Sequence, residues 1–172
     1  MTAAPLLLVL GGLPGTGKTT LARLLARDLS ATHLRIDTIE QAVVHSSLPV
    51  TEAAEVGYTA AMAVARDNLV LGLSVVADCV NPVTDSQAGW RTTAAETGAR
   101  LVEIQLVCSD RAEHRRRVED RVADIPGHVQ PTWAAVSAAV LDPWPDAVGL
   151  DSAGRTPTEL ARDARHLIDH GA

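Results

Sequence analysis

Short apolar runs alternate with segments of helical periodicity along most of the chain. Leu6-Leu7-Leu8-Val9-Leu10 is an unbroken apolar run, which is typical of a strand buried on both faces of a sheet. Behind it, leucines recur at helical spacing at positions 21, 24, 25 and 29. Alternation of this kind predicts a parallel sheet with helices on both faces.

The same pattern gives the expected boundaries of the elements. The expected strands cover about residues 6–11, 33–36, 73–77, 101–107 and 147–150. The expected helices cover residues 18–30, 38–47, 52–71, 84–97, 110–123 and 156–170, with a break at 48–50. Residues 124–146 are rich in proline and begin with Ile125-Pro126-Gly127-His128, which is typical of a hinge into a lid. We expect His128 in a surface loop, and we expect Trp133 and Trp144 either at an acceptor pocket or in the core.

A glycine-rich motif joins the first strand to the first helix. Gly12-Leu13-Pro14-Gly15-Thr16-Gly17-Lys18-Thr19 matches G-x-x-x-x-G-K-[ST], the phosphate-binding P-loop, and Thr20 follows it. Its lysine is the only one in the chain, which otherwise uses arginine, and an ammonium is a compact charge that reaches between phosphates. The glycines let backbone N–H groups turn toward a phosphate, and Thr19 is placed to ligate Mg²⁺. The motif predicts that the chain binds ATP and Mg²⁺.

The motif and the five strands together predict a fold. We expect one domain over residues 1–172 with the three-layer α/β/α architecture of P-loop NTPases, a five-stranded parallel sheet and a lid at 124–146. Ligands of such sheets bind outside the carboxyl ends of the strands. The residues that follow each strand are therefore the candidates for chemistry.

Two aspartates follow the second and third expected strands. Asp37 is placed to accept the proton of an acceptor hydroxyl or to anchor the substrate, although it also precedes a helix and could cap it. Asp78 ends an apolar run, as a Walker-B residue that orients Mg²⁺ through water does, or it is a turn residue. Which of the two is the base stays open. Asn81 could bind substrate or water, and Cys79 stands where an ATPase would carry a second acid, which disfavours simple hydrolysis.

A charged helix is expected after the fourth strand. Arg117 and Arg121 are four residues apart and would share a helix face, where they could stabilise a transferred phosphoryl group. The alternative is a solvated helix with pairs such as Glu113–Arg117. After the fifth strand, Gly154 and Arg155 could contact adenine, whereas Thr156 is expected to cap the last helix with Pro157 in its first turn and Glu159 at its third position.

Composition limits the partners of the protein. The formal net charge of −6 argues against a long nucleic acid partner, because no excess of basic residues is available for phosphates. The sequence contains no signal-peptide pattern and no long apolar run, and its two cysteines are isolated, so we expect a cytoplasmic protein without a membrane partner. We expect a monomer or a homodimer.

With these motifs in place, the whole chain resembles the small AAA-type P-loop kinases. Relatives of that kind include zeta toxins, chloramphenicol phosphotransferase, gluconate kinase, adenylylsulfate kinase and the kinase domain of phage polynucleotide kinase. The matching stretches are Gly12–Thr19, Arg35–Asp37, Val75–Pro82, Arg117–Arg121 and Asp151–Thr156.

The resemblance implies roles for three of these residues. It implies that Asp37 activates the acceptor, that Arg117 lies by the adenine and that Arg121 lies by the phosphates. Several relatives carry an arginine three residues after the aspartate to fix an acceptor that is often phosphorylated or a polynucleotide. This chain has Glu40 there, which suits a neutral polyol or a cationic acceptor.

The sequence thus predicts an ATP-dependent kinase that phosphorylates a hydroxyl of a small molecule. The competing interpretations are an ATPase regulated by a partner, without a small-molecule acceptor, and a zeta-like toxin that phosphorylates a nucleotide sugar. A GTPase is disfavoured because no second lysine is present to form [NT]-K-x-D.

Overall fold

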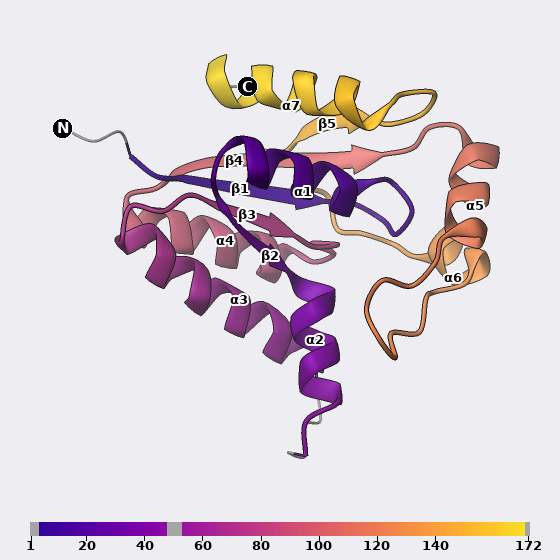
Figure 1. The fold of residues 1–172 in the computed structure, drawn as a ribbon, viewed down its shortest axis with the longest axis horizontal. Coiled ribbons are helices and arrows are strands. Elements are labelled where there is room, and N and C mark those ends of the chain that lie inside the picture. Colours follow the sequence, from indigo (N-terminus) through magenta and orange to yellow (C-terminus); the bar gives the residue numbers. More distant parts are fainter. Residues whose placement is uncertain (1–3, 48–52, 171–172) are drawn as a thin grey trace.

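A parallel five-stranded sheet forms the centre of the computed structural model, which describes residues 4–47 and 53–170 (Figure 1). The strand order is β2-β3-β1-β4-β5. The strands are β1 (Leu6–Gly11), β2 (Thr32–Arg35), β3 (Val75–Asp78), β4 (Arg100–Val107) and β5 (Val148–Asp151). The helices are α1 (Lys18–Asp28), α2 (Ile36–Val44), α3 (Ala53–Val70), α4 (Thr84–Thr97), α5 (Arg111–Asp120), α6 (Trp133–Ala138) and α7 (Pro157–His170).

Strand β1 is the centre of two hydrophobic cores, one on each face of the sheet. Its residues Leu6, Leu8 and Leu10 pack with apolar side chains of α1 and α7. Its alternate residues Leu7 and Val9 pack with side chains of α3 and α4. Figure 1 shows α1 and α7 on one side of the sheet and α3 and α4 on the other. The fold is therefore the expected three-layer α/β/α arrangement, and the unbroken apolar run of β1 follows from burial on both faces.

Several boundaries differ from the sequence expectation. Helix α2 begins at Ile36 with Arg35 as its N-cap residue, so Asp37 lies in the first turn and does not cap the helix. Helix α5 ends at Asp120, and Arg121 has an extended backbone with φ −69° and ψ 139°. Arg117 and Arg121 therefore do not share a helix face. The reason is that the chain turns away from α5 at Arg121, where the next residue, Val122, is 89% exposed and has no core to continue into.

The expected lid contains a short helix, α6, that the sequence did not indicate. The hydroxyl of Thr132 accepts the N–H of Ala135 and caps it. Figure 1 shows α5 and α6 beyond the carboxyl ends of the strands, where the chain covers the edge of the sheet. The expected break at 48–50 lies outside the described residues. Across 4–47 and 53–170, no helix is both long and apolar enough to cross a membrane.

Candidate active site

The P-loop has the backbone geometry that a phosphate site requires. Gly15 and Gly17 have φ of +87° and +97°, which side-chain-bearing residues rarely adopt. Gly17 is also the N-cap residue of α1, and it brings no side chain to cap the first-turn N–H groups. Those N–H groups are thus left for an anion at the positive end of the helix dipole.

Lys18 is held inside this loop. Its Nζ donates to the carbonyl of Leu13 at 3.0 Å, and the residue is 8% exposed. Burial lowers the pKa of Lys18, while the nearby carboxylates of Asp78 and Asp37 act in the opposite direction. The ammonium and both aspartates therefore belong to one electrostatic unit.

A cavity of about 670 Å³ opens at the carboxyl ends of the strands. Its volume is within the range of small-molecule and cofactor sites. The sequence-predicted residues in its wall are Pro14, Gly15, Gly17, Lys18, Thr19, Thr20, Asp37, Asp78, Arg117, Arg121 and Arg155. The predicted residues that do not line it are Gly12, Leu13, Thr16, Glu40, Asn81 and Gly154.

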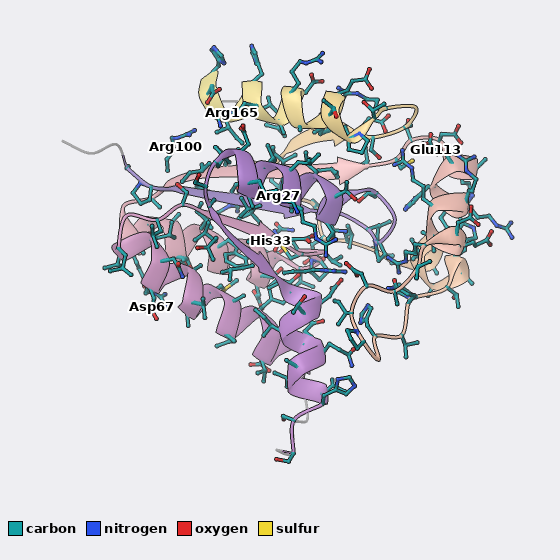
Figure 2. All side chains as sticks on the ribbon, in the orientation of Figure 1. Arg27, His33, Asp67, Arg100, Glu113 and Arg165 are labelled. Carbon is teal, nitrogen blue, oxygen red and sulfur yellow. The ribbon has the colours of Figure 1, made fainter. Side chains whose placement is uncertain are left out.

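Asp78 is buried at the end of β3, and its carboxylate is 3% exposed. His33 of β2, which Figure 2 labels, donates from Nε2 to Asp78 at 3.3 Å. Burial raises the pKa of Asp78, but hydrogen bonds from His33 and Thr19 and the charge of Lys18 outweigh it and hold the pKa below its ordinary value. A carboxylate that stays ionised beside the Thr19 hydroxyl has the chemistry of a Mg²⁺ site.

Asp37 is the more accessible of the two carboxylates. Its side chain is 38% exposed and lies 3.6 Å from Nη2 of Arg35. Both aspartates line the cavity, but Asp37 is 38% exposed and Asp78 only 3%, so a hydroxyl compound in the cavity can reach Asp37 more easily. The geometry thus gives the two aspartates different environments.

Glu40 and Asn81 lie away from the cavity wall, and their predicted substrate contacts stay predictions. Glu40 packs against α3, so closely that a Cβ on Gly57 would come within 2.5 Å of its Cγ. Burial raises the pKa of Glu40, and the negative charge of Asp37 raises it further. Asn81 has φ +54° and is 2% exposed. Its backbone N–H donates to the hydroxyl of Tyr58 at 2.8 Å, while its side-chain amide has no partner among the described residues.

The two arginines after β4 lie at different ends of the site. Arg117 donates to the hydroxyl and carbonyl oxygens of Ser152 at 2.9 and 3.0 Å, next to the end of β5. It also forms the expected pair with Glu113 of α5, at 2.5 Å. Figure 2 labels Glu113 on that helix. Arg121 is on the side of Asp37 and Arg35, whose charges act on it, and its Nε and Nη2 are buried without a partner among the described residues.

The segment after β5 is built around a helix cap. The hydroxyl of Thr156 accepts the N–H of Glu159, and the Glu159 carboxylate accepts the N–H of Thr156 at 2.8 Å. This reciprocal pair confirms the predicted capping box of α7. Arg155 lines the cavity and pairs with Asp163, whereas the N–H of Gly154 donates to Glu113 at 2.8 Å.

Trp144 and Cys79 are buried, and Trp133 lies against α5. Trp144 is 6% exposed, packs on Gly11 and donates from Nε1 to Glu103 at 3.1 Å, so it belongs to the core. Trp133 contacts the ring of His114. Burial raises the pKa of Cys79 to about 12. No group of three or more metal-ligating side chains occurs within 4–47 and 53–170.

The residues present fit a Mg²⁺-bound nucleoside triphosphate. Phosphates would be held by the uncapped N-terminus of α1, by Lys18 and by the partnerless Arg121 donors. Mg²⁺ would be held by Thr19 and Asp78. Arg23, Arg35, Asp124 and Gln130 also line the cavity and were not singled out from the sequence. Arg35 belongs to the Arg35–Asp37 motif, and the other three lie in segments that carry no motif.

Comparison with known proteins agrees with this arrangement. A family model described as an AAA domain, AAA_33, matches residues 7–140. The chain belongs to this AAA domain family. The match includes the P-loop, both aspartates and the two arginines after β4. A search of curated proteins finds no significant match.

Solved structures share the fold of this AAA domain protein over nearly its whole length. The APS kinase CysC of Mycobacterium tuberculosis, solved with AMPPNP and APS, is 18% identical with a TM-score of 0.71, covering 98% of this chain and 99% of its own. Kti12 of Chaetomium thermophilum, solved with ADP-AlF3, is 21% identical with a TM-score of 0.68 and coverage of 96% and 99%. A gluconokinase of Sinorhizobium meliloti 1021 is 19% identical with a TM-score of 0.61 and coverage of 99% and 100%.

Proposed function

We propose that this AAA domain protein transfers the γ-phosphoryl group of ATP to a hydroxyl of a small molecule. The observation that carries the proposal is the position of Asp37, an accessible carboxylate in the wall of the same cavity as Lys18 and Arg121. Two of the three structural relatives named above are kinases, one of which was solved with a nucleotide analogue and its second substrate.

Each side chain has a distinct part in the proposed step. Lys18 and the N–H groups at the start of α1 bind the phosphates, and Arg117 orients the adenine beside β5. Thr19 and Asp78 would hold Mg²⁺, which would neutralise charge on the phosphate oxygens. The oxygen of the acceptor hydroxyl forms a bond to the γ-phosphorus, and the bond from that phosphorus to the β-phosphate oxygen breaks. Asp37 accepts the proton that the hydroxyl loses. Arg121 then stabilises the equatorial oxygens.

The environment of Cys79 favours transfer over hydrolysis. An enzyme that hydrolyses ATP needs a group that activates water, and the residue after Asp78 is a buried thiol. With a pKa of about 12, that thiol stays protonated at neutral pH and is a poor base. The lid residues Gln130 and Pro131 line the cavity, where they help to exclude water.

The test is ADP release with a panel of hydroxylated acceptors. The panel contains sugars, polyols, nucleosides, adenylylsulfate, nucleotide sugars and aminoglycoside or phenicol antibiotics. We expect one acceptor to stimulate ADP release, and we expect Asp37→Ala to lower that rate about 10²–10⁴-fold while ATP still binds. Glu96→Gln, in an exposed ion pair with Arg66, is the matched control.

The alternatives give different results in the same assay. ATP turnover that no acceptor changes and that Asp37→Ala leaves intact would support a partner-regulated ATPase. Stimulation by nucleotide sugars alone would support a zeta-like activity. Lys18→Met removes the ammonium from the phosphate site and should stop turnover under every interpretation, so it tests nucleotide chemistry only.

A further inference from the structure

The wall of the cavity has an excess of positive charge. Lys18 and five arginines line it, against three aspartates, although the chain as a whole has a net charge of −6. In the proposed function Lys18 and Arg121 bind the phosphates. Two other arginines of the wall, Arg117 and Arg155, form ion pairs with Glu113 and Asp163. The two remaining arginines of the wall, Arg23 and Arg35, have no part in nucleotide binding and are free to serve a second anion.

Two of the arginines lie beyond the phosphate end of the site. In the proposed function the adenine lies toward β5, where Arg117 donates to the Ser152 hydroxyl. The strand order then runs from β5 through the P-loop strand β1 to β3 and β2, and Arg35 is the last residue of β2. Arg35 is therefore on the side where an acceptor must approach the γ-phosphate. Arg23 of α1 is the second arginine on this side of the cavity.

A carboxylate from the lid segment already binds these two arginines. Nη1 of Arg35 donates to both oxygens of Asp124, at 2.9 and 2.8 Å, and Nη2 of Arg23 donates to Oδ2 at 2.6 Å. Although partial burial raises the pKa of Asp124, the hydrogen bonds from Arg23 and Arg35 lower it to about 2. Short contacts from two guanidinium groups to one carboxylate are those of an anion site.

More donor capacity on this side of the cavity is unused. Nε of Arg35 is buried without a hydrogen-bond partner among the described residues, and Oδ2 of Asp78 lies 4.0 Å from it. A buried donor of this kind normally has a hydrogen-bond partner, so this atom points to a ligand with acceptor oxygens.

We propose that Arg35 and Arg23 bind an anionic group, a carboxylate or a phosphate, on the hydroxyl acceptor, and that Asp124 occupies this site until the acceptor displaces it. The inference rests on the proposed kinase function and specifies its substrate class. It differs from the expectation drawn from Glu40, and it is favoured because Arg35 lines the cavity and Glu40 does not. Arg35 would thus determine specificity for the acceptor.

The experiment uses acceptor pairs that differ in one anionic group. The pairs are gluconate with sorbitol and glycerol 3-phosphate with glycerol. Turnover is measured with MgATP, and binding is measured by calorimetry with MgADP, which needs no reaction. The variants are Arg35→Gln and Asp124→Asn, with Arg66→Gln as the matched control on an exposed pair of α3 and α4.

We expect the anionic member of at least one pair to bind in preference to its neutral partner. Arg35→Gln should raise the Kd or KM for the anion on the order of 10–100-fold and reduce the preference. Asp124→Asn should lower the same constant several-fold, because it removes the competing carboxylate. Arg66→Gln should change neither value.

Three results would overturn the inference. The first is equal binding of both members of each pair, and the second is that neither anion binds. The third is weaker anion binding in Asp124→Asn, which would show that Asp124 only holds the lid in place. The proposed function fails separately. Anion binding that depends on Arg35, without phosphoryl transfer, would support the anion site and refute the kinase function. Phosphoryl transfer without a preference for the anion would support the kinase function and refute the anion site.

Discussion

His114 of α5 connects the P-loop to the lid helix, and its replacement tests how the site is held together. Its Nε2–H donates to the carbonyl of Pro14 at 2.8 Å, and its ring meets Trp133 of α6 edge-on, with centroids 5.2 Å apart. His114 is 7% exposed. We predict that His114→Leu destabilises the protein and weakens ATP binding, because both contacts are lost at once.

The expected size of the effect follows from these two contacts. A buried carbonyl left without its donor costs about 1–3 kcal/mol, and an edge-to-face ring contact is worth about 0.5–1.5 kcal/mol. Pro14 is only half-buried, so water can replace part of the first contact, and we expect a loss of about 2 kcal/mol. For a domain of this size, that loss lowers the Tm by about 4–8 °C.

The assay is urea unfolding followed by ATP kinetics. The midpoint should fall with an unchanged m value, and the KM for ATP should rise about tenfold as the P-loop carbonyl loses its fixed position. His114→Gln is the matched variant because its amide can donate in place of Nε2, and it should recover most of the KM and part of the stability. A His114→Leu protein with wild-type stability and KM would show that α5 does not position the P-loop.

Three further predictions concern the cap of α7, the two cysteines and Asp151. Thr156→Ala should cost about 1 kcal/mol in urea unfolding, because its hydroxyl caps α7. In the native protein a maleimide should label Cys108, which is partly exposed, and not Cys79, whose pKa burial raises to about 12; mass spectrometry of the peptides tests this. A hydrogen bond from Ser109 lowers the pKa of Asp151 to about 2. The contribution of Asp151 to the free energy of unfolding is therefore complete above about pH 4 and is lost as the pH falls toward 2. Asp151→Asn should flatten that part of the profile of stability against pH.

The central part of the fold could be predicted because it depends on local sequence. A strand buried on both faces, a glycine loop and an amphipathic helix lie within residues 6–28, and each has its own signature. The capping box of α7 is local in the same sense, and the hydrogen bonds of Thr156 confirm it. Strand boundaries differ by one or two residues because the ends of such elements are set by their neighbours in the sheet.

The errors occurred where the tertiary environment overrides local preference. A spacing of four places Arg117 and Arg121 on one face only if the helix continues, and α5 stops at Asp120, where Arg121 takes an extended backbone and Val122 is 89% exposed. Asp37 has the sequence of a cap but lies inside α2, because the chain enters the helix directly from β2 at Arg35. The helix of the lid was missed because six residues carry little periodicity.

The anion site shows most clearly what a single sequence cannot reveal. Arg23, Arg35 and Asp124 come from a helix, a strand and the segment before the lid helix, and 89 residues separate the last two. Each alone has the sequence context of a solvated charge, and only the folded chain brings the two arginines to the carboxylate of Asp124. Net charge is equally uninformative here, because an acidic protein can gather its arginines around one cavity. Evidence for the class of acceptor therefore lies in the distribution of charge in the cavity rather than in the composition of the chain.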